Sequence, residues 1–595
     1  MTFSNSPVPS NAALLVQLYS YISSQRRRQF IALLVLTIIS AMAEVVSLSA
    51  IFPFIGVLTQ PEKVFGLPAM AGVVQSLGIS SGTDLVLPLS IGFAIAALLA
   101  GGLRLLLLWV SIRLGNAIGA DLSIEVYRRT LYQPYSVHVA RNSSEIISGI
   151  TQKVDTTTSV LISAVAVITS TVLFVAIMMT LITIDPIVAI IAALSFGSAY
   201  SVIALLTRSR LVNNSQCIAQ EQTRVVKALQ EGLGAIRDVL LDGAQKVYCN
   251  VYRKAIIEFQ RALGENTFIN QAPRYAMESI GMALIAALVL ILSTRPGGVA
   301  AALPILGMLG LGAQRLLPLM QQVYGNWSVV AGSKAALVEV LALLNQPLLA
   351  EAGQPEPAPL ILKDAIRFQN VHFHYGANGP WVLNGINLVI PKGARIGFVG
   401  STGSGKSTVL DLLMGLLEPT QGEILVDGQP IGHEIQRAWQ RTIAHVPQNI
   451  FLADTTFAEN IAFGIPPDQI DYQRMHEAAE QARIAEFIES RPEGYGGEVG
   501  ERGVRLSGGQ RQRIGIARAL YKQASVLIFD EATSALDNET EQAIMQAIEG
   551  LSENLTICIV AHRLTTLKNC TQIVELGDCG IKRTGSYQDI VAHTA

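Results

Sequence analysis

The sequence has little charge for its length. Only 15% of its 595 residues are Asp, Glu, Lys or Arg, whereas half are hydrophobic, and the mean hydropathy is +0.41. Soluble globular domains usually carry about 25% charged residues. The formal net charge of −2 also lacks the basic surplus that a nucleic-acid-binding protein shows. These shortages indicate a membrane protein and predict no nucleic-acid partner.

Cysteine is scarce as well. The five cysteines are scattered and lack metal-ligand spacing: Cys217, Cys249, Cys558, Cys570 and Cys579. Such a set makes neither a disulfide framework nor a zinc site, so we expect reduced thiols. A cleavable signal peptide is not expected, because a polar, Pro-containing start and the basic cluster Arg26–Arg28 lead into a full-length apolar run.

A change in composition divides the chain. The Pro-rich stretch NQPLLAEAGQPEPAPLIL at 345–362 separates long apolar runs from an alternation of short β-rich and helical patterns. We therefore predict an N-terminal cytoplasmic segment (1–29), a transmembrane domain (30–344), a linker (345–362) and an α/β domain (363–595).

Long apolar runs in the first domain predict six membrane spans. A span needs about 20 mostly apolar residues, and six runs qualify: 30–58, 85–112, 160–182, 186–206, 274–294 and 299–324. The alternative for any one run is a buried helix of a soluble protein. Segments 113–159 and 207–271 are too polar for lipid but keep helical apolar periodicity. We expect them to extend the spans into the cytoplasm as long helices.

The distribution of positive charge predicts the orientation. Arg26–Arg28 precede the first span, and segment 207–271 is rich in Lys and Arg. Because cytoplasmic loops carry such an excess, we predict a multi-pass protein of the plasma (inner) membrane with its N-terminus and α/β domain in the cytoplasm. On the outer side, segment 61–80 forms either a short amphipathic helix or a plain loop.

A phosphate-binding motif lies early in the α/β domain. ARIGFVGSTGSGKSTVL has the pattern G-x-x-x-x-G-K-[ST] between a strand-like and a helical segment. Glycines let backbone N–H groups surround phosphate oxygens, and the helix N-terminus adds a positive dipole. Lys406 would reach the β- and γ-phosphates of ATP, and Ser407 would bind Mg²⁺. The predicted binding loop is Gly400, Ser401, Thr402, Gly403, Ser404, Gly405, Lys406, Ser407 and Thr408.

Two acidic residues follow the apolar run Val526–Phe529, which we expect to be a buried strand. Asp530 is placed to hold Mg²⁺, directly or through water. Glu531 can polarise the attacking water as a general base. Such a pair could otherwise cap a helix, but a phosphate loop in the same domain favours catalysis.

The stretch VRLSGGQRQRIGIARAL lies between these motifs, and Ser507–Gln510 begin its helical pattern. With this stretch the chain resembles the ATP-binding cassette (ABC) transporters, of the exporter type that joins six spans to one cassette. The resemblance covers nearly the whole chain. It implies a membrane α-helical bundle of six transmembrane helices extended into the cytoplasm, plus an α/β P-loop ABC ATPase domain.

The resemblance also implies roles for further residues. The family's signature matches Leu506–Gln510, so Ser507, Gly508, Gly509 and Gln510 would bind nucleotide. Gln448 matches the Q-loop glutamine, which contacts nucleotide and metal, and Tyr375 stands where an aromatic ring stacks on adenine. His562 matches the catalytic switch histidine. Gly497–Gly503 resembles the exporter X-loop, and Ser534–Asp537 the D-loop.

A partner chain is implied as well. In the family, the signature of one cassette closes over ATP held by the phosphate loop of another. One chain here has one of each motif, so it resembles half of a transporter. A homodimer is favoured because both halves of the ATP site are intact, and a heterodimer stays open. Coupling helices are implied near Pro134–Asn142 and Leu233–Asp242, the second reaching the partner's cassette.

Three arginines interrupt the predicted spans. Arg104, Arg274 and Arg315 lie about 28, 30 and 24 Å from the outer edges of their spans. Arg104 and Arg274 could snorkel to the headgroups, or Arg274 could pair with Glu278. A charge near the bilayer centre is costly, so Arg315 should face a cavity. Glu44 is costly by the same argument, and either pairs with an arginine or receives a polar part of the cargo.

These residues suggest a class of cargo. A dimer would gather six guanidiniums, which suit phosphate, and exporters that flip lipid-linked oligosaccharides have cavity arginines. We therefore expect a flippase for an anionic amphiphile such as a lipid-linked pyrophosphate oligosaccharide, which Glu44 and the three arginines would contact. The alternative is a multidrug or peptide exporter with an aromatic, apolar cavity.

Overall fold

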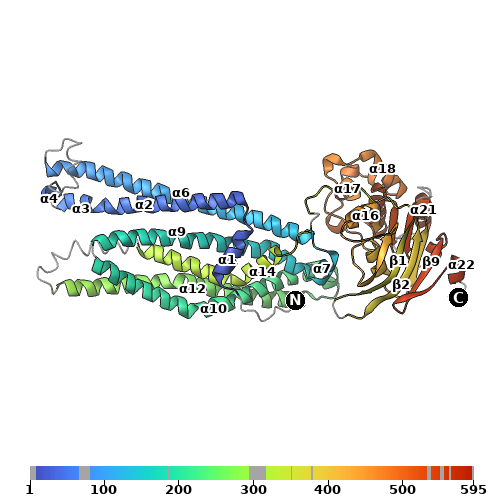
Figure 1. The fold of residues 1–595 in the computed structure, drawn as a ribbon, viewed down its shortest axis with the longest axis horizontal. Coiled ribbons are helices and arrows are strands. Elements are labelled where there is room, and N and C mark those ends of the chain that lie inside the picture. The colour runs from blue at the N-terminus through green and yellow to red at the C-terminus, as the bar shows by residue number, and fades with distance from the viewer. Residues whose placement is uncertain are drawn as a thin grey trace. The chain divides into compact units, whose positions relative to one another are not determined.

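The protein is described by a computed structural model that covers residues 9–59, 61–65, 81–184, 186–293, 316–349, 352–376, 379–531, 538–549, 555–561 and 564–591. Contacts divide the chain into two units. The first is Met1–Gln133 with His138–Leu349, and the second is Pro134–Val137 with Ala350–Ala595. In Figure 1 the first unit is helical and the second combines helices with sheets.

The helices of the first unit follow the apolar and polar segments in chain order, and the first residues of one of them, Tyr135–Val137, are assigned to the second unit. They are α1 (Asn11–Ser20), α2 (Ser24–Ser49), α3 (Ile51–Thr59), α4 (Pro61–Phe65), the 3₁₀ turn η2 (Gly82–Leu85), α6 (Val86–Leu131), α7 (Tyr135–Ala140), α8 (Ser143–Ser148), the π-helical turn η3 (Gly149–Lys153), α9 (Val154–Ile184), α10 (Pro186–Gly234), α11 (Ile236–Leu241), α12 (Gln245–Ser293), a helix over Leu316–Gly332, and α14 (Lys334–Leu344).

Local sequence explains where the first helices begin and break. Ser10 and Ser23 accept hydrogen bonds from backbone N–H groups in the first turns of α1 and α2, as N-cap residues do. The first predicted span, 30–58, is divided between α2 and α3. Pro53 has no N–H to donate to the carbonyl one helical turn before it, so the helix breaks near Ala50.

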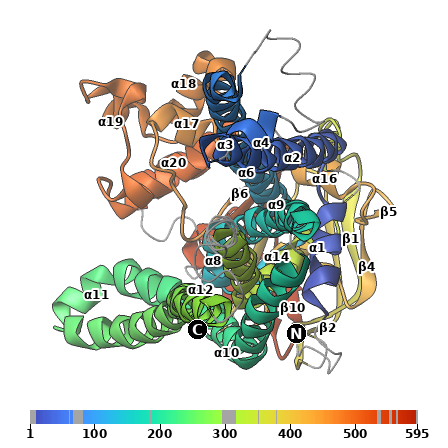
Figure 2. The same ribbon diagram turned by 90° about the vertical axis from the view of Figure 1, so that its left-hand side faces the viewer.

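Three helices extend well beyond a membrane thickness. α6 has 46 residues, and α10 and α12 have 49 each, as expected for spans that continue into polar extensions. Figure 2 shows α10 and α12 side by side, with the short α11 between their ends. The short helices α7 and α11 lie at the two positions where the family resemblance implies coupling helices.

Hydropathy identifies membrane spans among the described residues. Ser24–Ser49, Gly82–Leu131 and Ser143–Thr183 are each long and apolar enough to cross a membrane. A fourth candidate is the pair Leu316–Gly332 and Lys334–Leu344, which is bent by 56°. The predicted fourth and fifth spans lie in α10 and α12. Much of the sixth, and residues 66–80 of the outer segment, lie outside the described residues.

The second unit holds two sheets. An antiparallel sheet has the order β2-β1-β4-β5, and a mostly parallel sheet has the order β10-β9-β3-β8-β7-β6. The strands are β1 (Ala365–His374), β2 (Trp381–Pro391), β3 (Arg395–Gly400), β4 (Gln421–Val426), β5 (Gln429–Pro430), β6 (Ile443–Val446), β7 (Val526–Asp530), β8 (Thr556–Val560), β9 (Gln572–Gly577) and β10 (Gly580–Gly585).

Helices complete this unit. They are α15 (Lys406–Leu413), α16 (Gln436–Thr442), α17 (Phe457–Ile461), α18 (Tyr472–Gln481), α19 (Ala485–Glu489), α20 (Gly508–Tyr521), α21 (Asn538–Glu549) and α22 (Tyr587–Val591), with 3₁₀ turns η4 (Pro467–Gln469), η5 (Gly494–Gly496), η6 (Glu501–Gly503) and η7 (Leu564–Leu567).

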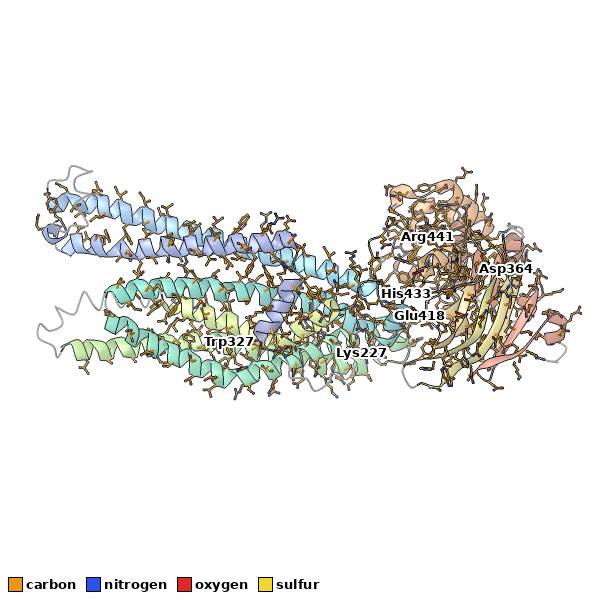
Figure 3. All side chains as sticks on the ribbon, viewed as in Figure 1. Lys227, Trp327, Asp364, Glu418, His433 and Arg441 are labelled. Carbon is orange, nitrogen blue, oxygen red and sulfur yellow. The ribbon has the colours of Figure 1, made fainter. Side chains whose placement is uncertain are left out.

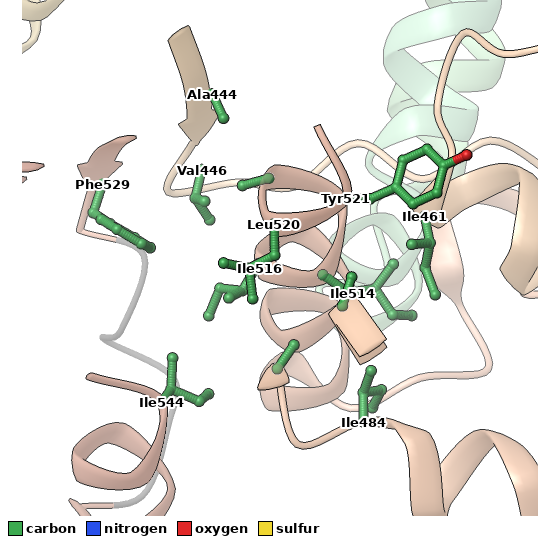
Figure 4. Close-up of a cluster of buried hydrophobic side chains, with 14 of the residues drawn as sticks. Ala444, Val446, Ile461, Ile484, Ile514, Ile516, Leu520, Tyr521, Phe529 and Ile544 are labelled. Carbon is green, nitrogen blue, oxygen red and sulfur yellow. The ribbon is translucent and has the colours of Figure 1, made fainter. Parts of the chain in front are cut away.

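Two apolar clusters hold the second unit together. One cluster joins the two sheets and α15 around Phe398 and Trp439. The indole N–H of Trp439 donates a hydrogen bond to the carbonyl of Leu413 at 2.8 Å. The other packs α20 against β6 and β7 through side chains such as Ile516 and Phe529 (Figure 4). These clusters fix the carboxyl ends of β3 and β7, where the predicted nucleotide motifs begin.

Candidate nucleotide site and membrane arginines

The predicted phosphate loop connects β3 to α15 through a turn that requires glycine. Gly405 has φ +93°, and a Cβ there would approach the Leu383 side chain to 2.7 Å. A Cβ on Gly400 would lie 2.4 Å from the carbonyl oxygen of Leu576. Glycine therefore lets the loop curl tightly and present the first N–H groups of α15, which have no intrahelical acceptor.

The polar side chains of this loop fit a phosphate ligand. The buried Lys406 ammonium donates to the carbonyls of Gly400 and Ser401 at 2.9 and 3.0 Å. The buried Ser404 hydroxyl has no hydrogen-bond partner among the described residues. A cation held by neutral carbonyls, beside an unsatisfied hydroxyl and a helix N-terminus, can exchange these contacts for phosphate oxygens.

The two acidic residues stand at the same edge of the sheet. β3, β8 and β7 are parallel neighbours, so the phosphate loop and the residues after β7 leave their strands on one side. Asp530 ends β7, and Glu531 follows with a left-handed φ of +51°. β8 ends at Val560, two residues before His562, which lies outside the described residues, as does Ser534–Asp537.

Gln448 contacts the predicted base directly. Its Nε2 donates to Oε2 of Glu531 at 2.7 Å. The predicted metal ligands Ser407, Gln448 and Asp530 would offer hydroxyl, amide and carboxylate oxygens, the hard donors that Mg²⁺ prefers. The chemistry of this set therefore fits the ion.

Asp411 is a titratable neighbour that motif reasoning missed. Burial, and the charge of Asp530, raise the pKa of Asp411 to about 6. Asp411 follows Ser407 by four residues on α15, so it lies one turn further along the same helix face. This four-residue spacing could have identified Asp411 from the sequence as a neighbour of the site. The half-exposed Tyr375 also contacts the loop, since its hydroxyl lies 3.2 Å from the Thr408 hydroxyl.

The signature residues form a helix cap. Ser507 Oγ accepts from the backbone N–H of Gln510 at 3.2 Å, and the Gln510 side chain accepts from the N–H of Ser507 at 2.9 Å. This capping box starts α20 at Gly508. Within the described part of the chain, neither side chain hydrogen-bonds to the phosphate loop.

The structure brings two of the four predicted substrate residues together. Arg104 Nη1 on α6 lies 3.1 Å from Oε1 of Glu44 on α2. The Glu44 side chain is 6% exposed and that of Arg104 is 38% exposed. Arg274 instead pairs with Glu278 at 3.0 Å, the alternative considered from its i,i+4 spacing. Arg315 lies outside the described residues.

A polar face on α2 surrounds Glu44. Thr37, Ser40 and Ser47 are buried with it and recur at helical spacing within an otherwise apolar span. On the neighbouring α9, Ser170 donates to Gln322 at 2.9 Å. Sequence reasoning singled out the charged residues and passed over these hydroxyls, although their spacing could have identified the face.

Both units match families of known proteins. The family model described as the ABC transporter transmembrane region matches residues 25–295, and the one described as ABC transporter matches residues 383–534. The chain is 30% identical to an "ATP-dependent lipid A-core flippase" of Alkalilimnicola ehrlichii over 80% of this chain and 81% of that protein. A protein of the same name from Chromohalobacter salexigens is 31% identical over 79% and 81%.

A solved structure has the same fold. It is described as "Structure of a bacterial Atm1-family ABC exporter with ATP bound", with a TM-score of 0.78, 24% identity and 96% coverage of both chains. The comparisons and the helical and α/β units agree with the expected fold class. The chain belongs to the ABC transporters, with a membrane region fused to an ATPase domain, and couples ATP hydrolysis to transport.

Proposed function

We propose that two copies of this chain form a flippase in the plasma (inner) membrane that moves an anionic amphiphile from the cytoplasmic to the outer side. A lipid-linked pyrophosphate oligosaccharide is the expected cargo. In this proposal the N-terminus and the ATPase unit lie in the cytoplasm. The relatives named lipid A-core flippases support a lipid as the cargo.

The Arg104–Glu44 pair carries the proposal of an anionic cargo. The carboxylate is buried, whereas the guanidinium keeps more than a third of its surface exposed. Glu44 therefore holds Arg104 at one edge while other N–H donors of the guanidinium remain accessible. A planar five-donor group of this kind can bind phosphate oxygens in pairs.

ATP would bind across the phosphate loop. Lys406 would exchange the carbonyls of Gly400 and Ser401 for the β- and γ-phosphates, and the Tyr375 ring would stack on adenine. Ser407, Gln448 and Asp530 would hold Mg²⁺, which neutralises phosphate charge when bound. The hydroxyl, amide and carboxylate oxygens of these residues support that assignment.

Glu531 would act on the attacking water. As the water oxygen bonds to the γ-phosphorus, its proton passes to the Glu531 carboxylate, and the bond from the γ-phosphorus to the bridging oxygen breaks to leave ADP. Gln448 would respond to the protonation of Glu531, because its amide donates a hydrogen bond to the same carboxylate. His562 is proposed as the second catalytic residue.

The second copy would complete each ATP site. Ser507 and the N–H groups of Gly508 and Gly509 begin α20, a helix of 14 residues whose N-terminus favours anions. In the proposed dimer, these donors and Gln510 meet the γ-phosphate held by the partner's phosphate loop.

A panel of lipids tests the cargo. Purified protein in nanodiscs is titrated with undecaprenyl pyrophosphate, its glycosylated form, a neutral glycolipid and cationic drugs, and ATPase stimulation is measured. We expect stimulation by the pyrophosphate lipids. The double variant E44Q/R104Q should lose this response without leaving an unpaired buried charge, whereas Arg113→Gln, an exposed position on α6, should keep it. Stimulation by cationic drugs alone would instead identify a multidrug exporter.

A further inference from the structure

A cavity with a mainly apolar lining and several polar groups lies among the helices of the first unit, away from Glu44 and Arg104. It has a volume of about 220 Å³ and lies beside the bend between the Leu316–Gly332 helix and α14. Its walls also include α9, α10 and α12. Trp327, labelled in Figure 3, marks the Leu316–Gly332 helix.

Glycines let two walls of this cavity approach closely. Asn270 on α12 donates to the carbonyl of Gly325 at 3.1 Å, and Asn266 donates to that of Gly332 at 3.4 Å. A Cβ on Gly332 would lie only 2.8 Å from the Asn266 amide nitrogen. The asparagines thus bind helix backbone through their amide nitrogens, which orients the side chains and preforms this side of the cavity.

The residues that line the cavity are uncharged. Its polar groups are amides and hydroxyls, such as Gln222, Thr267 and Ser328, and the residues that line it include no Asp, Glu, Lys or Arg. The Gln222 carbonyl oxygen is buried and has no hydrogen-bond partner among the described residues. A lining of this kind offers nothing to neutralise an anion or to coordinate a metal cation.

Most of the surface that lines the cavity is apolar. Phe259 and Leu263 on α12 line it together with the amides. A pyranose ring matches this combination, because its hydroxyl edge donates and accepts hydrogen bonds while its C–H face packs against an aromatic ring. Water alone would also fill the space, at roughly seven molecules of about 30 Å³ each.

We infer that this cavity binds a sugar unit of the transported headgroup. The inference rests on the proposed function and assigns the carbohydrate to a site of its own. Arg274 follows Asn270 by four residues on α12, so it lies about 6 Å further along the same helix face. A sugar in the cavity and its phosphate at Arg274 match the order of a glycosyl phosphate.

Paired lipids test the site. The probes are undecaprenyl pyrophosphate with and without an attached disaccharide, and the readout is the half-maximal concentration for ATPase stimulation in nanodiscs. The double variant Q222L/T267V removes polar groups from the cavity, and Gln220→Leu is the control at an exposed position on the same helix. Thermal melting of each variant monitors folding.

The expected result is selective. Two lost hydrogen bonds of about 0.5–1.5 kcal/mol each should raise the half-maximal concentration of the glycosylated lipid by about 5- to 160-fold. The midpoint for the unglycosylated lipid should stay at the wild-type value, and Gln220→Leu should match wild type for both. Equal wild-type midpoints for the two lipids, or an equal shift for both in Q222L/T267V, would overturn the sugar site. If neither lipid stimulates the wild type, the proposed function itself fails.

Discussion

Gln448 donates a 2.7 Å hydrogen bond from Nε2 to the Glu531 carboxylate, joining the second residue after β6 to the first residue after β7. The Glu531 backbone has a left-handed φ of +51°, and its N–H donates to the carbonyl of Val560 on β8. The proposed base is therefore held from two neighbouring strands, so its position depends on the sheet as a whole.

Glu531→Gln should abolish turnover and preserve ATP binding. The amide keeps the shape of the side chain but cannot accept a proton, and general-base catalysis typically contributes 10²–10⁴-fold. Phosphate release and binding of a fluorescent nucleotide measure the two effects. Glu539→Gln, an exposed position on α21, is the matched control. Hydrolysis by Glu531→Gln at the wild-type rate would rule out the assigned base.

Mixing two inactive variants tests the shared ATP site. Lys406→Ala removes the phosphate contact, and Ser507→Arg blocks the signature. In a mixed dimer, the intact Lys406 and the intact Ser507 can meet at one site. Co-expression should restore activity to about a quarter of wild type if the two sites of a C₂ dimer act independently. Activity of either variant alone would exclude the composite site, and so would verified mixed dimers that remain inactive.

The buried ion pair of Lys153 predicts an asymmetric effect on stability. The Lys153 side chain is 2% exposed, and its ammonium contacts the Thr223 hydroxyl at 2.8 Å and pairs with Glu339 on α14, whose side chain is 41% exposed. Glu339→Gln leaves a buried cation without a counter-charge, which typically costs about 3–5 kcal/mol. Lys153→Met leaves only a solvated carboxylate. The melting temperature should therefore fall further for Glu339→Gln, and the reverse order would contradict the assigned burial of the ammonium.

His445 predicts a loss of stability in mild acid. Burial lowers the pKa of this β6 histidine to about 4, and its Nε2 is buried without a partner among the described residues. Above pH 6.5 the ring is neutral in both the folded and the unfolded chain. As the pH falls from 6.5 towards 4, the unfolded chain binds a proton that the folded chain excludes, so the free energy of unfolding decreases.

Between pH 7 and pH 5 this decrease is about 2 kcal/mol. Melting curves of wild type and His445→Phe at both pH values measure it. The pH dependence should shrink in His445→Phe and persist in His433→Gln, whose ring is exposed at the surface near Glu418 (Figure 3). An unchanged pH dependence in His445→Phe would assign the acid sensitivity to other groups.

Motifs formed by contiguous residues could be predicted from the sequence, whereas contacts between distant segments could not. The phosphate loop and the signature are each contiguous in the sequence, so spacing predicts the role of Lys406 and the family resemblance that of Ser507. The proximity of Asp411 to Asp530, by contrast, depends on strand order and helix packing. In the membrane unit, apolar runs locate the helices, but only the packing of α2 against α6 decides that Glu44 pairs with Arg104. The break near Ala50 was readable from Pro53, a signal that hydropathy alone ignores.

The uninterrupted course of α10 has a mechanical consequence. With 49 residues the helix is about 74 Å long. A rod of that length acts as a lever, since a rotation of about 5° at one end sweeps the other through about 6 Å. A small tilt at one end of α10 therefore becomes a displacement larger than one helical turn at the other end.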